Sequence, residues 1–576
     1  MDTRAGQSLP GSLHGTVTAT TPDGQTFTVE GARMELDGSA SGLPSLSAFS
    51  NQNGAFSFAG VEAGRYNLKV SSPGFKVFSR SVNVESGEGS LQDIRLEFEA
   101  VRQEIEVHEQ APRVSQESTA PPATLSAPRL KTVPTTQSKF KEALPFVPSV
   151  VRPPDEKIYI KGTAESQGML LTDSLQDVDP VTGAFVIDMP LDAIDSLEVF
   201  KAPFRTEYGG FSGGMTSIHS KAPSSHWNFA MHDVNPSIRG REGHWVGFAK
   251  AEPRIYFSGP LFKNLTFSEA FLYEMRKEPI RGLAWPHNES MTQGFNSFTS
   301  FQYLFSPTHL TTVHVNVFPR RQQFANINAL IPQTASFDYG LRGYSLGIAD
   351  SYQFRSGGLL ASQFKVTRSS ANVHGQGSDD MLLTPNGLDG HYFNTWNRDI
   401  RQEEALETFE FPMTEKFGKH QVKVGADFLH RSFDGFSRSH PVLLLRADGS
   451  VAERIDFSGD GLLTASDTQV AGFVQDHWAL TDQLALDLGV RYFGQSSGES
   501  ADFEPRLGVV FSPDKNGKTI FRGGIGLFDD RTPMLAADFG DSPARVVSLF
   551  DPQGGLVGSP TAFTNACAQK DRKSVV

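Results

Sequence analysis

Long segments that alternate apolar and polar residues recur from about residue 224 onward. The clearest is LALDLGVRYF at 484–493. Its apolar face carries Leu484, Leu486, Leu488, Val490 and Tyr492, and its other face carries Ala485, Asp487, Gly489 and Arg491. HQVKVGADF (420–428) and TIFRGGIGLF (519–528) keep the same period of two, which is that of a β-strand. The pattern predicts strands with one apolar face and one face of polar residues or glycine.

The connections between these segments alternate in length. Tight turns at 417–419, 481–482 and 512–518 are interleaved with long polar stretches, of which the longest runs from Ser437 to Thr468. Short turns on one side and long loops on the other are typical of an outer-membrane β-barrel, whose strands need only about 9–11 residues to cross the bilayer. A large soluble sandwich gives similar strands, but its loops are not expected to segregate so regularly. Since no run of 18 apolar residues occurs, the sequence predicts no membrane-spanning helix.

Length, charge and cysteine content narrow the function classes. The 576 residues favour about three or four domains. A net charge of −13 argues against nucleic-acid binding, which requires a basic surface. Cys567 is the single cysteine, so intrachain disulfides and CxxC metal or redox sites are excluded.

The first 223 residues divide into three parts by composition. Residues 11–99 contain short alternating segments such as GAFSFAG and GRYNLKVSS and predict a small β-sandwich. Residues 100–135 are rich in Pro, Ser and Thr after a strand-like QEIEVHE segment and predict a linker. Residues 136–223 mix a short helix, ended by Pro145 and Pro148, with short strands. The remainder, 224–570, is the strand-rich part, and 571–576 is an odd DRKSVV tail.

The stretch FRTEYGGFSGGMTSIHSK (204–221) holds four glycines, at 209, 210, 213 and 214. It lacks the Gly-Lys-Ser/Thr ending and the strand–loop–helix frame of a phosphate-binding loop. Glycines also allow sharp turns and close approach of two backbones. We therefore predict a structural role for them.

Three parts of the chain resemble known families. The rhythm of Asn53-Gly54, Phe56, Phe58, Tyr66 and the Pro73-Gly74-Phe75 turn is similar to the carboxypeptidase regulatory-like domain, which is not catalytic. Residues 144–221 resemble the plug of TonB-dependent outer-membrane receptors. The matching positions include Leu144-Pro145, Lys161-Gly162, Asp173, Leu191-Asp192-Ala193-Ile194, Leu197, Glu198, Val199, Tyr208, Gly209, Gly213 and Gly214. The strands after them resemble the Oar-like subgroup.

This resemblance implies a mainly β protein with an N-terminal sandwich, a small α+β plug and a transmembrane antiparallel β-barrel of about 22 strands, here truncated. It implies a location in the outer membrane of a Gram-negative bacterium, in contact with lipid. The partners implied are an unidentified extracellular ligand and TonB with its inner-membrane energising complex, and no enzyme activity, cofactor or nucleic acid is implied. TonB pairs by strand addition with a short segment before the plug. Our candidate for that contact is Glu104, Ile105, Glu106 and Val107, which could instead be the last strand leaving the sandwich.

Two further patterns bear on metals. Asp456, Ser458, Asp460, Gly461, Thr464 and Asp467 fall at the spacing of a calcium-binding loop, with Asp in place of the final Glu and without flanking helices. A polar loop with a turn at Asp460-Gly461 is the favoured explanation of the pattern. The histidines at 219, 226, 232 and 244 lack ligand spacing. We therefore predict no metal site there.

The function expected is energised uptake of a ligand from the peptide, saccharide, siderophore or cofactor class. One alternative is an Oar-like adhesion or export-associated protein without uptake, and another is a soluble carbohydrate-binding β-sandwich protein. Because a signal peptide is not visible and about fourteen strands can be counted, we expect a fragment. The tail 571–576 fits a translated sequencing adapter and is interpreted as an artefact.

Overall fold

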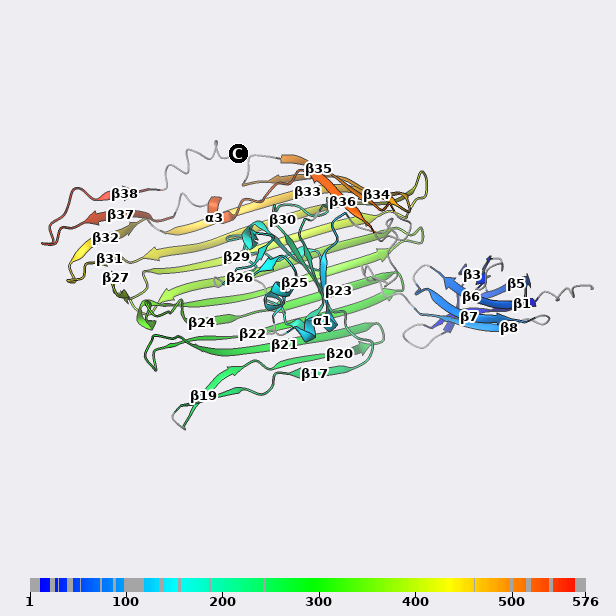
Figure 1. The fold of residues 1–576 in the computed structure, drawn as a ribbon, viewed down its shortest axis with the longest axis horizontal. Coiled ribbons are helices and arrows are strands. Elements are labelled where there is room, and N and C mark those ends of the chain that lie inside the picture. Colours follow the sequence, from blue (N-terminus) through cyan, green and yellow to red (C-terminus); the bar gives the residue numbers. More distant parts are fainter. Residues whose placement is uncertain are drawn as a thin grey trace, which may run out of the picture.

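The computed structural model describes residues 11–20, 26–29, 31–38, 45–51, 53–72, 75–85, 90–97, 119–133, 139–153, 157–185, 188–202, 204–241, 244–459, 461–497, 501–513, 519–537 and 542–564. Within them the chain is mostly β-strand (Figure 1). The predicted mainly β fold is confirmed. No helix in these ranges is long and apolar enough to cross a membrane.

The N-terminal part is a sandwich of two four-stranded sheets. One sheet holds β1 (Gly11–Thr20), β2 (Thr26–Thr28), β5 (Ala55–Val61) and β8 (Ser90–Leu96), and the other holds β3 (Arg33–Gly38), β4 (Leu46–Phe49), β6 (Gly64–Ser71) and β7 (Phe78–Val84). The inward residues of both sheets share one apolar core, in which Phe56, Phe58, Tyr66, Leu68 and Val70 are buried as the period of two requires.

The plug is a small α+β domain around a five-stranded sheet. The sheet order is β14 (Leu175–Gln176), β13 (Met169–Thr172), β16 (Met215–Ser220), β15 (Ile194–Phe200) and β9 (Ala123–Ser126). A three-stranded sheet joins β10 (Val150–Val151), β11 (Tyr159–Ile160) and β12 (Thr163–Ala164). The helical segments are α1 (Ala127–Thr132), α2 (Phe140–Ala143) and the 3₁₀ turns Leu144–Phe146, Glu165–Gln167 and Leu191–Ala193.

Part of the predicted linker belongs to the plug. β9 pairs with β15 from Ser196↔Ser126 to Val199↔Ala123, and α1 follows it directly. The Pro-rich composition was misleading because Pro128 sits in the first turn of α1, where a missing N–H costs nothing. Leu125 and Leu130 are buried in the plug core.

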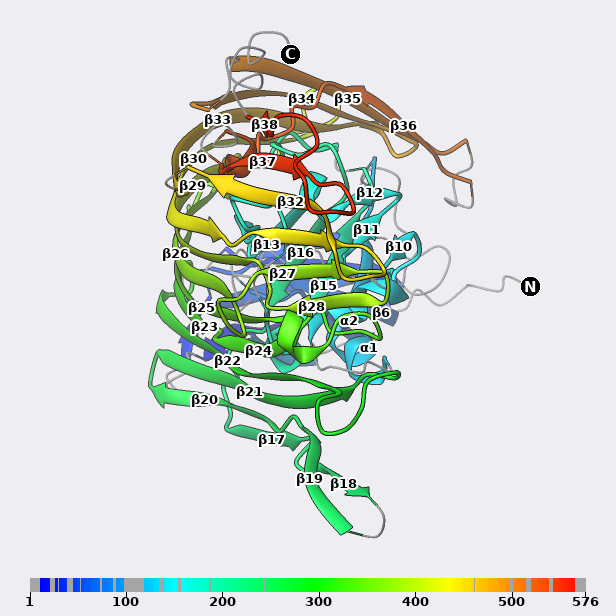
Figure 2. The same cartoon turned by 90° about the vertical axis from the view of Figure 1, so that its left-hand side faces the viewer.

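The wall is one curved antiparallel sheet around the plug (Figure 2). Its strands are β17 (Asn228–His232), β18 (Ser237–Arg241), β19 (His244–Ala251), β20 (Arg254–Phe262), β21 (Leu265–Pro279), β22 (Glu289–Ser306), β23 (His309–Val317), β24 (Arg320–Ala325), β25 (Phe337–Gln353), β26 (Leu359–Gly375), β29 (Asn394–Glu410), β30 (Lys419–Ser439), β33 (Leu462–Thr481), β34 (Leu484–Gln495), β35 (Ala501–Phe511) and β36 (Phe521–Gly526). The sheet order is β17-β20-β21-β22-β23-β25-β26-β29-β30-β33-β34-β35-β36, and β17 and β36 end this path among the described residues. The hairpin β18–β19 adds to β21, and β24 pairs with both β22 and β25.

A second sheet lies beyond the wall, at its long-loop end (Figure 1). It joins β27 (Met381–Thr384), β28 (Gly387–Gly390), β31 (Val442–Leu445), β32 (Val451–Ser458), β37 (Ala544–Leu549) and β38 (Thr561–Phe563). Two short helical segments also lie in connections of the wall: Gln333–Ala335 between β24 and β25, and α3 (Met534–Ala537) between β36 and β37. The long loop expected from Ser437 to Thr468 is thus mostly strand. β30 and β33 extend into it, and β31 and β32 form part of the second sheet.

Aromatic rings follow the short-turn end of the wall on its outer face. Ring centroids lie 4.6 Å apart for Tyr303 and Phe305, 4.9 Å for Tyr352 and Phe354, and 4.8 Å for Phe409 and Phe411. Phe305 and Tyr352 also meet His309 from either side. An exposed aromatic girdle at one rim of a barrel is the signature of a membrane–water interface.

Candidate functional site: the plug docked against the barrel wall

A buried ion pair joins the end of the plug sheet to the wall. Asp177 follows β14 and binds Lys365 of β26, and their side chains are 2% and 8% exposed. Lys365 Nζ also donates to the Gln176 carbonyl at 3.3 Å, and the Gln176 amide donates to Glu404 at 2.7 Å. Burial raises the pKa of Asp177, and Lys365 works against that shift. The pair therefore docks the plug at the cost of two desolvated charges.

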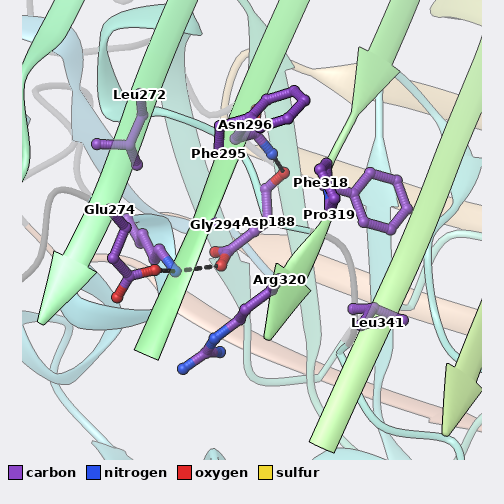
Figure 3. Close-up of a pocket in the computed structure, with 11 residues that line it drawn as sticks. Asp188, Leu272, Glu274, Gly294, Phe295, Asn296, Phe318, Pro319, Arg320 and Leu341 are labelled. Carbon is purple, nitrogen blue, oxygen red and sulfur yellow. Dashed lines mark hydrogen bonds and ion pairs between the residues drawn. The ribbon is translucent and has the colours of Figure 1, made fainter. Parts of the chain in front are cut away.

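A second ion cluster lies on the other side of the plug (Figure 3). Lys139 Nζ lies 2.8 Å from Asp188 of the plug and 2.7 Å from Glu274 of β21. The Asn296 side-chain amide donates to the Asp188 carbonyl at 2.5 Å. Burial opposes ionisation of Asp188, but Lys139 and Arg320 together lower the pKa of Asp188 below its ordinary value. The cluster lines a pocket of about 40 Å³ between plug and wall.

Basic side chains of the wall hold the glycine-rich end of the plug by its backbone. Arg491 Nη1 donates to the carbonyls of Thr206 at 3.2 Å and Glu207 at 3.1 Å. Arg506 Nη1 donates to the carbonyls of Arg205 and Tyr208, at 2.7 and 2.6 Å. These arginines therefore donate hydrogen bonds to four successive backbone carbonyls, 205–208, which lie outside regular secondary structure.

A carboxylate fixes the same segment. Lys423 of β30 pairs with Glu207, and the Glu207 amide donates to the side chain of Gln475 at 3.2 Å. Burial opposes ionisation of Glu207, yet Lys423 and Arg205 together hold its pKa below the ordinary value.

The glycines of this segment are required by close approach. A Cβ on Gly209 would lie 2.4 Å from Arg491 Nε, and one on Gly214 would lie 2.3 Å from a side-chain carbon of Ile160. A Cβ on Gly213 would meet the Gln167 carbonyl at 2.9 Å. Only Gly210 has a positive φ, +74°. The predicted structural role of the stretch agrees with these contacts.

The first described plug residue is tied to the wall near a short turn. The Thr119 backbone N–H donates to Asp487 Oδ2 at 3.1 Å, and the Thr119 hydroxyl binds the same oxygen. His477 Nδ1 lies 2.7 Å from the other oxygen of Asp487. Asp487 stands three positions after the start of β34, which follows the turn at 482–483. Thr119 thus lies at the short-turn end of the barrel.

A segment after β36 ties the opposite end of the plug to the loop sheet. Arg531 donates to the carbonyls of Gly168 at 3.0 Å and Gly210 at 3.2 Å. The Met534 amide donates to the Pro180 carbonyl at 3.1 Å, and Met534 is buried against Val181. The chain then continues into β37 of the loop sheet.

The other residues singled out in the plug are structural parts of it. Leu197 and Val199 are buried in the plug core, and the Glu198 carboxylate accepts from His219 Nε2 at 3.3 Å. Asp173 accepts from the Ser220 amide at 2.8 Å, and Tyr208 packs on Phe200 with ring centroids 5.7 Å apart. The TonB-contact candidate Glu104, Ile105, Glu106 and Val107 lies outside the described residues, as does the tail 571–576.

The two end positions of the calcium-loop pattern are engaged in other contacts, and its Asp460 lies outside the described residues. Asp467 lies in β33, where its carboxylate binds Arg431 at 2.5 Å, and Asp456 lies in β32 bound to Arg454 at 2.9 Å. Both end positions of the pattern are thus neutralised by arginine. In the described part of the chain no group of three or more His, Cys, Asp or Glu side chains is placed to hold a metal.

Comparison with known proteins gives two domain matches. Residues 12–97 match the carboxypeptidase regulatory-like domain, and residues 284–526 match the TonB dependent receptor-like β-barrel. Residues 284–526 thus match the β-barrel of the TonB-dependent receptor family. The place of the chain is therefore the outer membrane of a Gram-negative bacterium, and the wall described above is the receptor barrel.

Individual relatives are distant. An iron-regulated outer membrane virulence protein of Vibrio cholerae is 22% identical over 328 residues, which are 56% of this chain and 43% of the relative. The chain thus spans less than half the length of that relative. The outer membrane transporter YddB of Escherichia coli shares the fold with a TM-score of 0.55 and 12% identity, covering 76% of this chain and 67% of YddB. The siderophore receptor PirA of Acinetobacter baumannii gives 0.54 and 13%, covering 77% and 70%.

Sequence reasoning missed the wall residues that hold the plug. Lys365, Lys423 and Arg506 were not singled out from the sequence. A usable signal existed, because each is a basic residue on the inward face of an alternating strand, and inward cations need an acidic or carbonyl partner.

Proposed function

We propose that this chain is the receptor and transporter for energised uptake of a ligand across the outer membrane, driven by TonB. The observation that carries the proposal is the chemistry of the plug–wall contact. The apolar core lies mainly in the plug and extends to Tyr256, Ala270 and Phe298 of the wall. Ion pairs and hydrogen bonds also fix the plug to the wall on several sides.

Such a contact suits a plug that moves. An apolar contact of the same area loses about 25 cal/mol for each Å² exposed to water. A hydrogen bond or ion pair exchanges its partner for water at a small net cost, near 1 kcal/mol for a neutral bond. The same geometry holds the plug firmly at rest, because buried charges are costly to unpair one at a time.

We propose that TonB applies its pulling force to the segment that precedes Thr119. Thr119 lies at the short-turn end, which is the periplasmic end of an outer-membrane barrel. The segment Glu104, Ile105, Glu106 and Val107 precedes this point by about a dozen residues. It is proposed to add a strand to TonB through main-chain hydrogen bonds.

A binding experiment tests the coupling. The full chain, purified from outer membranes, is incubated with the periplasmic domain of TonB. Deletion of residues 103–108 is compared with deletion of 111–116, a matched six-residue deletion in the same segment. The proposal expects TonB binding to be lost in the first variant and kept in the second. Equal binding by both variants would contradict the assigned contact.

The ligand is proposed to be of the peptide, saccharide, siderophore or cofactor class. An Oar-like role in adhesion or export is the competing function. It predicts outer-membrane residence without any effect of TonB. A soluble carbohydrate-binding role predicts recovery of the chain in the aqueous fraction.

A further inference from the structure

Acidic residues recur on the outer face of the wall, close to its short turns. We call them the acidic band, and they are Glu269 of β21, Asp350 of β25, Glu407 of β29 and Asp476 of β33. Each lies within five residues of the end of its strand at a short turn, which is about 8–13 Å along the barrel axis at the usual rise and tilt of a strand. That level is close to the boundary between the head groups and the acyl chains of the periplasmic leaflet.

Glu269 and Asp476 face outward because the residue before each of them faces the lumen. Glu269 follows Ser268, which is 4% exposed. Asp476 follows Gln475, whose side chain accepts a hydrogen bond from the plug. Successive residues of a strand point to opposite faces, so both acidic side chains lie on the lipid-facing side.

Asp350 and Glu407 face outward together. They pair in register with Ser362 of β26 from either side, so the three residues share one face of the sheet. Asp350 also shares that face with Ile348, which is exposed, and Glu407 is itself exposed. The acidic band thus lies on the surface that meets the membrane.

An aromatic residue accompanies every member of the acidic band. Residues two apart in a strand share a face, and on each of the four strands the residue two positions nearer the short turn is aromatic. The pairs are Glu269 with Phe267, Asp350 with Tyr352, Glu407 with Phe409, and Asp476 with Trp478. A carboxylate next to an aromatic face therefore repeats four times along the wall.

Hydroxyl and imidazole groups of the neighbouring strands orient the four carboxylates. Ser297 and Thr299 donate to Glu269 at 2.6 and 2.5 Å, Ser362 donates to Glu407 at 2.9 Å, Thr311 donates to Asp350, His309 Nε2 lies 2.9 Å from Asp350, and His420 Nδ1 lies 2.7 Å from Asp476. In the part of the chain that the structure describes, no lysine or arginine forms an ion pair with any of the four. A charge on the lipid face of a barrel is unfavourable, so a cationic group of the membrane is the partner that compensates it.

An ammonium group fits each carboxylate–aromatic pair. The carboxylate balances the positive charge and accepts N–H hydrogen bonds, and the face of the aromatic side chain attracts a cation. The four pairs are spread from β21 to β33, which is seven strand spacings, or about 34 Å of wall (Figure 1). This spread suits several small head groups better than one folded partner.

We propose that the acidic band binds phospholipids with a primary ammonium head group, such as phosphatidylethanolamine, in the periplasmic leaflet. The ammonium group donates hydrogen bonds to the carboxylate and lies against the aromatic side chain beside it. Charge complementarity selects this occupant, because the band carries four carboxylates and an anionic lipid would be repelled. The inference is independent of the proposed uptake function, since it concerns the outer face of the wall.

Native mass spectrometry of the purified full chain tests the lipid preference. The chain in detergent is titrated with an equimolar mixture of phosphatidylethanolamine and phosphatidylcholine that carry the same acyl chains. The two head groups have the same net charge, but only the first has N–H donors. We expect occupancy by phosphatidylethanolamine to be higher by about tenfold, because charge-assisted hydrogen bonds are lost with the second lipid. Equal occupancy, or stronger binding of phosphatidylglycerol in a second titration, would overturn the proposal without the need for any variant.

Two matched double variants locate the site. Asp350→Asn with Glu407→Gln removes two of the four carboxylates and should lower the number of bound phosphatidylethanolamine molecules by about half. Asp399→Asn with Glu403→Gln should leave that number unchanged, because these exposed residues of β29 flank Arg401 instead of an aromatic residue. Equal loss in both double variants would overturn the assignment.

A quadruple variant closes the test. Adding Glu269→Gln and Asp476→Asn to the first double variant should remove the preference for phosphatidylethanolamine over phosphatidylcholine. Circular dichroism checks that the barrel is folded in each variant. A folded quadruple variant that keeps the preference would contradict the proposal.

Discussion

Replacing Lys365 by Met leaves the Asp177 carboxylate buried and unpaired inside the barrel. Asp177 is 2% exposed at its side chain, so water cannot replace the lost ammonium group without plug movement. Breaking a buried pair by removing one partner costs about 3–5 kcal/mol. At about 1.4 kcal/mol per factor of ten, this is roughly two to four orders of magnitude in the docking equilibrium of the plug. The companion variant Lys365→Met with Asp177→Asn removes both charges and should recover most of the loss.

Hydrogen–deuterium exchange measured by mass spectrometry follows the docking directly. Peptides covering β13 and β14 should lose protection in Lys365→Met and regain it in the double variant, while Lys416→Met in an exposed short turn should change nothing. The defect should shrink at low pH, because burial raises the pKa of Asp177 and a protonated carboxyl carries no charge to bury. Unchanged exchange in the single variant, or a double variant no better than the single, would refute the reasoning.

Three other outcomes are expected. Gly209→Ala places a Cβ 2.4 Å from Arg491 Nε and should speed exchange in 204–210, whereas Gly523→Ala, with nothing within 4 Å, should not. Glu207 stabilises the docked plug fully above its unfolded pKa of about 4.3, and this stabilisation is lost as the pH falls through the lower pKa of the docked state. Protection of 204–210 from exchange should therefore fall in that pH window. Glu207→Gln should abolish this pH dependence. Arg531→Met removes two hydrogen bonds to plug carbonyls, at about 1.5–3 kcal/mol each, and should raise exchange in both plug and loop sheet, with no change contradicting the tie.

Much of the fold was predictable because it follows from side-chain periodicity. In 484–493, Ala485 and Arg491 are buried and Tyr492 is 38% exposed, as the alternation requires. Loop composition was less informative. The stretch after Ser437 looked irregular because its strands pair with distant segments, β27 and β37, which local sequence does not reveal.

The docking site was predictable only on the plug side. Its glycines and its Leu-Glu-Val strand lie in one continuous stretch of sequence, so their order along the chain can be recognised. Lys365, Lys423 and Arg506 come from three different strands, and their partners lie far away in the chain. These contacts depend on the strand register of the barrel and on the position of the plug inside the wall. The alternation of residues within a single strand gives no information on either.

The most direct test of the central claim is a mechanical one. Thr119 Cβ lies 3.0 Å from a Cβ placed on Gly508, near the 3.8 Å typical of a disulfide, so Thr119→Cys with Gly508→Cys can lock the plug to the wall in a Cys567→Ser background. The TonB periplasmic domain, attached to a force probe, pulls on the full chain held in a membrane. We predict that the reduced form extends as the plug leaves its wall contacts, and that the oxidised form does not extend. Detachment of TonB without extension of the reduced form, or equal extension of both forms, would contradict the account.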